Sequence, residues 1–114
     1  MIIRNLTPHP VVLAGCVIAP SGRIARVSTT STVVGEVHFV GDDGMEHSVP
    51  LRRDAFGAVV DLPAPEDGVL LLVSAMVAQA AGRVDVMSPG DLVRDSTGRV
   101  VGANALQAAK EEES

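Results

Sequence analysis

The segment with the clearest chemical potential lies near the start of the chain, where two prolines flank a histidine: Asn5-Leu6-Thr7-Pro8-His9-Pro10. Proline rings restrict the backbone on both sides of His9, so its imidazole is carried by a stiff loop. Beside Thr7, such a histidine could hydrogen-bond a ligand or act as a general base. The alternative is structural, because Asn, Thr and His side chains commonly satisfy backbone groups where a strand ends.

Arginine supplies eight of the nine basic residues, and its planar donor fork suits carboxylates and phosphates. Arg26 shares a strand face with Ile24, so it leans inward if that face is the core and is an ordinary surface residue otherwise. Arg83 and Asp85 flank Val84, where they could bind an anion together or simply form a surface ion pair. The predicted ligand-binding residues are Thr7, His9, Arg26, Arg83 and Asp85.

Two further histidines flank the turn-forming sequence Gly41-Asp42-Asp43-Gly44. A symmetric closure of this turn places His38 opposite His47, with Glu36 on the same face of the hairpin. Two histidines and a carboxylate can bind a divalent metal, although an ordinary cross-strand pair is the simpler interpretation. A β-bulge at the turn would separate the two rings altogether.

Glycine and proline recur every eight to twelve residues, with short β-branched runs between them, which is typical of many short antiparallel strands. Three segments have turn chemistry and predict hairpin loops, namely residues 19–22, 41–44 and 95–98. Ser74 and Gly82 bracket a run of helix-forming residues, which predicts a short helix over residues 74–81. A nucleophilic role for Ser74 is not supported, because the glycines of a nucleophile elbow are missing.

These elements predict an α+β fold, mainly antiparallel β with short hairpins and one short central helix. We expect one globular domain over residues 1–106 and an acidic, disordered tail over residues 107–114. The sequence has no phosphate loop, dinucleotide fingerprint, zinc motif or catalytic Cys/His pattern, so no cofactor, metal or catalytic residue is predicted.

The amino-acid composition argues against two classes of binding partner, nucleic acids and membranes. The 114 residues carry a net charge of −5, with no Trp, no Tyr and two Phe, which argues against nucleic-acid binding. The uncharged, largely apolar run of residues 69–82 is shorter than the ~20 residues of a membrane span, and we expect no membrane partner. The lack of a signal-peptide pattern and the single cysteine, Cys16, lead us to expect a cytoplasmic protein.

Short motifs occur in one order along nearly the whole chain. They include Asn5-Leu6-Thr7-Pro8-His9-Pro10-Val11, Pro20-Ser21-Gly22, Phe56-Gly57-Ala58-Val59, Arg83-x-Asp85 and Pro89-Gly90-x-Leu92. In these motifs the chain resembles a family of small uncharacterised proteins from actinobacteria, haloarchaea and phages. The resemblance implies a phage–host context, in which small accessory proteins often bind another molecule and block it.

Three functions remain open at this point. The favoured one is a non-catalytic binding protein that sequesters a small anionic, nucleotide-like ligand or caps a protein partner. The second is a small enzyme that uses His9 as general base with Asp85 or Asp91, and the third is a structural or assembly subunit. The 46% hydrophobic content also predicts self-association, with a symmetric homodimer as its commonest form.

Overall fold

The computed structural model describes residues 1–109. The chain divides into two compact units, which are described separately. The body unit consists of Met1–Val27 together with the residues from Ala58 onward, and the second unit is Ser28–Gly57, called here the arm. In residues 1–109 no helix is both long and apolar enough to cross a membrane.

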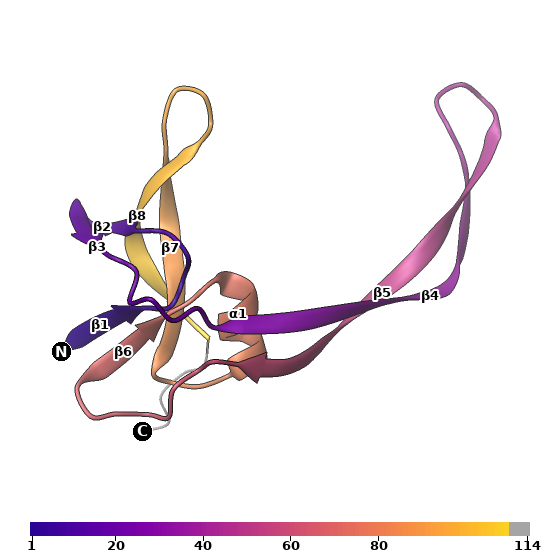
Figure 1. The fold of residues 1–114 in the computed structure, drawn as a ribbon. Coiled ribbons are helices and arrows are strands. Elements are labelled where there is room, and N and C mark those ends of the chain that lie inside the picture. The colour runs from indigo at the N-terminus through magenta and orange to yellow at the C-terminus, as the bar shows by residue number, and fades with distance from the viewer. Residues whose placement is uncertain (110–114) are drawn as a thin grey trace. The chain divides into compact units, whose positions relative to one another are not determined.

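The body unit contains a six-stranded sheet and one helix (Figure 1). In sheet order the strands are β1 (Ile2–Asn5), β6 (Val69–Leu72), β7 (Val86–Arg94), β8 (Val100–Ala108), β2 (Val11–Leu13) and β3 (Cys16–Ile18). Strands β7 and β8, and β2 and β3, pair antiparallel, whereas β1–β6, β6–β7 and β2–β8 pair parallel. The predicted α+β, β-rich class is confirmed, although short hairpins alone do not predict the parallel pairs.

The core of the body unit forms around β6. This strand and the following Val73 read as a continuous apolar run, which is typical of a strand covered on both faces. Leu71 and Val73 are almost fully buried and pack in one cluster with Leu6, Val77 and Val86. The strand therefore positions both the N-terminal loop and the helix.

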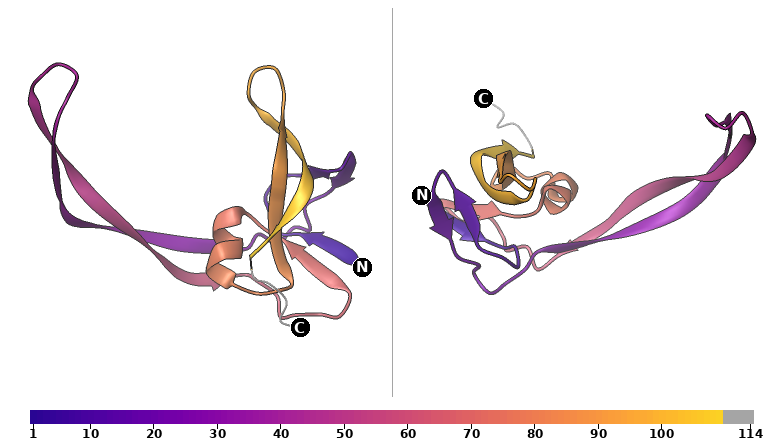
Figure 2. Two further views of the ribbon diagram at one scale, coloured as in Figure 1. Left: turned by 180° about the vertical axis from the view of Figure 1, so that it is seen from behind. Right: turned by 90° about the horizontal axis from the view of Figure 1, so that it is seen from above.

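The helix α1 (Ala75–Ala81) matches the prediction closely. The Ser74 side chain accepts a hydrogen bond from the Val77 N–H, which satisfies one of the free donors of the first turn. Gly82 ends the helix in the left-handed conformation, with φ 58°. Val77 and Ala78 are buried, and α1 contacts β7 (Figure 2).

Two of the three predicted hairpin loops are confirmed. Residues 41–44 and 95–98 each close with a hydrogen bond from the final glycine N–H to the carbonyl of the first residue, and Gly44 and Gly98 have positive φ. The prediction for residues 19–22 is wrong. The Ser21 N–H donates to the Asn5 carbonyl, so this segment joins β1 instead of folding back on β3.

The arm is a two-stranded antiparallel ribbon built from β4 (Arg26–Val40) and β5 (Glu46–Val60). The first residues of β4 and the last residues of β5 belong to the body unit. The sequence predicted four shorter strands here, over residues 23–29, 33–40, 45–51 and 58–60. The Ser/Thr-rich stretch 28–32 contains no breaker, so β4 continues through it. Figure 1 shows the ribbon twisting along its length.

The predicted acidic tail began at residue 107. Strand β8 runs to Ala108, with Gln107 paired to Ser88, so residues 107 and 108 belong to the sheet. Residues 110–114 lie outside the described part of the chain.

The Ser74 cap predicts the effect of a single substitution. Ser74→Ala removes the acceptor for the Val77 N–H and should lower the free energy of unfolding by about 0.5–2 kcal/mol. Chemical denaturation followed by circular dichroism measures this, with the exposed turn residue variant Ser96→Ala as control. Equal stability of Ser74→Ala and the wild type would contradict the capping role.

A second prediction concerns pH. The Thr97 hydroxyl, followed by the backbone N–H groups of Arg99 and Thr97, holds the pKa of Asp95 below its ordinary value of 3.8. The contribution of Asp95 to hairpin stability is therefore present above 3.8 and is lost as the pH falls through the lowered pKa. NMR titration of the Asp95 carboxyl should give a midpoint below 3.8 that rises in Thr97→Val. A wild-type midpoint at or above 3.8 would contradict the hydrogen-bond assignment.

Candidate functional site

The N-terminal motif forms a hydrogen-bond network around Asn5, which is only 1% exposed. The Asn5 Nδ2 donates to the carbonyls of His9 and Ile18, both at 2.9 Å. Its Oδ1 accepts from the Thr7 backbone N–H at 2.9 Å and from the Thr7 hydroxyl at 2.6 Å. Both donors and both acceptor positions of the amide are thus occupied by the protein itself.

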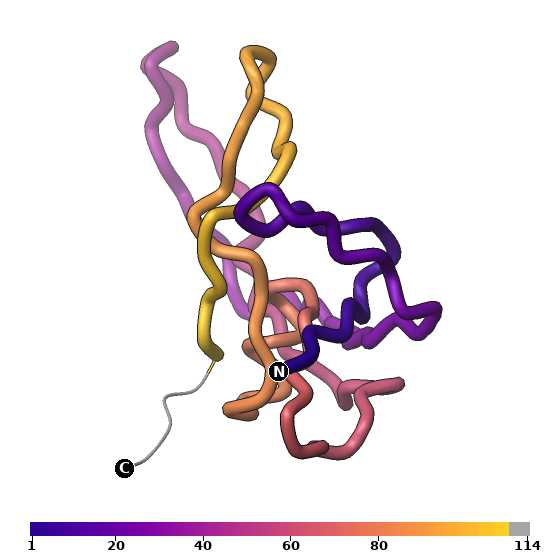
Figure 3. The backbone as a smooth tube through the Cα atoms, turned by 90° about the vertical axis from the view of Figure 1, so that its left-hand side faces the viewer, coloured from indigo at the N-terminus to yellow at the C-terminus, as the bar shows by residue number. Residues whose placement is uncertain are grey.

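This network joins the two edges of the body sheet. Asn5 ends β1, which is one edge strand, and Ile18 ends β3, which is the other. Asn5 also forms an isolated parallel bridge with Pro20, where the chain returns past β1 (Figure 3). The Thr7 hydroxyl and the His9 carbonyl therefore take part in linking the two edge strands. This agrees with the interpretation that the motif satisfies backbone groups where a strand ends.

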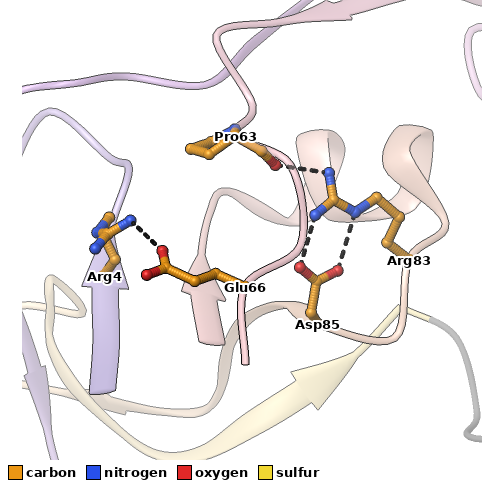
Figure 4. A network of polar contacts seen from close by, with 5 residues as sticks. All are labelled: Arg4, Pro63, Glu66, Arg83 and Asp85. Atoms are coloured by element: carbon orange, nitrogen blue, oxygen red, sulfur yellow. Dashed lines mark hydrogen bonds and ion pairs between the residues drawn. The ribbon is translucent and has the colours of Figure 1, made fainter. Parts of the chain in front are cut away.

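Arg83 and Asp85 form a second local network in the body unit (Figure 4). The Arg83 Nε and Nη2 donate to the two carboxylate oxygens of Asp85, at 2.9 and 2.6 Å. The remaining Nη1 donates to the Pro63 carbonyl at 2.9 Å. The Arg83 and Asp85 side chains are 26% and 21% exposed. All three nitrogens of the guanidinium donate to partners within the protein.

Within residues 1–109, no hydrogen bond connects all of the predicted ligand-binding residues into one site. Hydrogen bonds link Thr7 to the His9 carbonyl, and others link Arg83 to Asp85, but none joins these two groups. Arg26 is exposed, whereas its neighbour Ala25 is buried. The core side of this strand is the Ala25 side, so the condition for an inward-leaning Arg26 is not met.

The predicted pairing of His38 with His47 is wrong. The Gly41 N–H donates to the Met45 carbonyl at 3.0 Å, and Gly44 takes the extra, positive-φ position of a G1-type bulge. Counting from the Gly41–Met45 pair places Phe39 opposite His47, and their rings stack with centroids 5.4 Å apart. The bulge shifts the register by one residue, which moves His38 to the other face of the ribbon.

Side-chain contacts on that other face agree with this register. Ser48 donates a hydrogen bond to Glu36, and the His38 Nε2 lies 4.0 Å from a Glu36 oxygen. The His47 ring instead lies 2.9 Å from an Asp43 carboxylate oxygen at the turn. Within the described residues, no group of three or more His, Cys, Asp or Glu side chains has a metal-binding arrangement.

The register divides the arm into an apolar and a polar face. The apolar face of the arm consists of side chains that are all between 40% and 55% exposed: Val33, Val37, Phe39, Val49 and Leu51. The opposite face alternates Val34 and Val40 with Glu36, His38 and Ser48. No other element belongs to the arm unit, so nothing within that unit covers the apolar face.

This apolar face was not among the sites predicted from the sequence. The signal was present in the alternating apolar residues 33, 37 and 39 and in residues 49 and 51 after the turn. It was obscured by the one-residue register error, which mixes the two faces. No protein-family model, curated protein or solved structure matches this chain.

The Asn5 network predicts an unusually sensitive position. Asn5→Asp replaces a donor with an oxygen that faces the carbonyls of His9 and Ile18, so it should destabilise the chain by at least about 2 kcal/mol, as should Asn5→Ala. Denaturant unfolding measures the loss. The control is Asn104→Asp at the chain's other, exposed asparagine, which should change stability by no more than about 0.5 kcal/mol. Equal effects at both positions would contradict a stabilising role of the Asn5 network.

Proposed function

We propose that this protein is a non-catalytic assembly module, and that the apolar face of its arm binds a protein chain. The observation that carries the proposal is the uncovered row of Val33, Val37, Phe39, Val49 and Leu51 on a two-stranded ribbon. Exposed apolar surface that is contiguous and bordered by polar residues is characteristic of protein-interaction sites.

The energetics of small sheets support the proposal. A two-stranded hairpin is marginally stable in water by itself, and independent stability needs more strands or a packed face. Each arm strand is 15 residues long, well above the usual strand length of about 5–6 residues. A ribbon of this length gains a stable conformation when its apolar face packs against another chain.

The partner is expected on the face of the ribbon, because one of its edges is blocked. In the register set by Gly41 and Met45, residue 50 falls at a position whose backbone N–H points away from β4. Proline occupies that position, so it costs the ribbon no hydrogen bond but denies a donor to any strand added beside β5. Pro50 thus protects this edge from edge-to-edge pairing.

Binding of a small anionic ligand at Thr7, His9, Arg26, Arg83 and Asp85 stays a prediction, as does the cytoplasmic location. Such a ligand would have to compete with Asp85 for the donors of Arg83. The resemblance to phage and archaeal proteins is compatible with an assembly module but is not needed for the argument.

Site-specific photo-crosslinking in cells tests the proposal. A benzophenone amino acid replaces Val37 on the apolar face in one variant and Val34 on the polar face in the control, both in full-length protein. These positions are three residues apart on β4 and have similar exposures, 40% and 48%. We expect an adduct of higher mass from position 37 and much less from position 34.

The same experiment can contradict the proposal. If position 37 gives no adduct, or if both positions give the same adducts in equal yield, the apolar face of the arm is not a specific protein-binding surface.

A further inference from the structure

We infer that the chain bound by the apolar face of the arm is a second copy of this protein, packed face to face and antiparallel about a twofold axis. This inference rests on the proposed function and specifies its partner. A twofold interface uses the same patch on both copies, so the patch must be complementary to itself.

The first requirement is that the face does not repel its own copy. The acidic residues of the ribbon strands, Glu36, Glu46 and Asp54, have even numbers and lie on the polar face in the register described above. The apolar face carries no carboxylate between residues 33 and 39 or between residues 47 and 53. Two apolar faces can therefore meet without burying opposed negative charges, which is not true of the polar faces.

The second requirement concerns charge along the arm. Asp42 and Asp43 lie at the tip, whereas counting from the Gly41–Met45 pair puts Arg53 opposite Val33 on the apolar face, about nine residues or ~30 Å from the tip. The Asp43 carboxylate is engaged by the Met45 N–H and the His47 ring, which leaves Asp42 as the acid offered to a partner. In an antiparallel pair the basic level of one arm meets the acidic tip of the other.

The position of the twofold axis follows from these two charges. The midpoint between Arg53 and Asp42 along the ribbon falls between the Val37–Val49 and Phe39–His47 pairs, within about two residues of the centre of the apolar face. The same arrangement thus packs the Val37–Val49 and Phe39 levels of the two copies against each other and pairs Arg53 with Asp42 at both ends. A parallel arrangement would place acidic tip against acidic tip.

Sedimentation equilibrium of the purified full-length chain tests the inference. We expect a mass of twice 11.8 kDa at micromolar concentration, and dissociation on dilution. Val37→Asp should raise the dimer dissociation constant at least about tenfold, because it buries an unpaired charge. The matched control, Val34→Asp on the polar face of the same strand, should change it less than about threefold.

A charge exchange separates this arrangement from a simple loss of folding. Arg53→Glu and Asp42→Arg should each weaken dimerisation, and the double variant Arg53→Glu/Asp42→Arg should restore it, because the two charges meet between copies. Recovery in the double variant cannot result from unfolding. Failure of the double variant to recover would overturn the antiparallel arrangement.

The outcomes also distinguish this inference from the proposed function. A purified chain that stays at 11.8 kDa up to its solubility limit, with a crosslink in cells from position 37 to a different protein, would overturn the dimer and leave the proposed function standing. Absence of both the dimer and the crosslink would overturn both.

Discussion

The structure depends on one constraint, which is that a two-stranded sheet has no second layer with which to cover its own apolar face. In larger sheets a helix or another sheet supplies that layer. In the arm, Val37, Phe39 and Leu51 have no such neighbour within their unit. Because burial of apolar area is the main favourable contribution to folding, this face is where the proposed partner chain would supply the missing layer.

The body unit meets the same requirement with its own residues. Its central strand β6 is buried, α1 packs on β7, and the amide of Asn5 links the two edge strands. Polar side chains that the sequence marked as candidate ligand-binding residues make hydrogen bonds within the fold. The Thr7 hydroxyl completes the Asn5 network, and Arg83 donates to Asp85 and to the Pro63 carbonyl. In the proposed function, the interaction surface is therefore on the arm and not on the body unit.

Local signals in the sequence predicted the elements that local chemistry determines. Ser74 and Gly82 fixed the helix ends, and the glycines of residues 41–44 and 95–98 fixed two turns. The sequence could not determine which strands pair in parallel, because that depends on distant residues. The candidate site was missed for a smaller reason: the bulge at Gly44 shifts the register by one, and in a strand one residue exchanges the two faces.

The chain's two phenylalanines offer the most direct test of the claim that a protein chain covers the apolar face. Phe39 lies on that face and Phe56 near the base of the arm, with nearly equal exposures of 43% and 47%. Hydroxyl-radical footprinting of the assembled protein reports the accessibility of both rings in one sample. A covered apolar face predicts strong protection of Phe39 relative to Phe56, lost in Val37→Asp. Equal oxidation of the two rings in the wild type would contradict it.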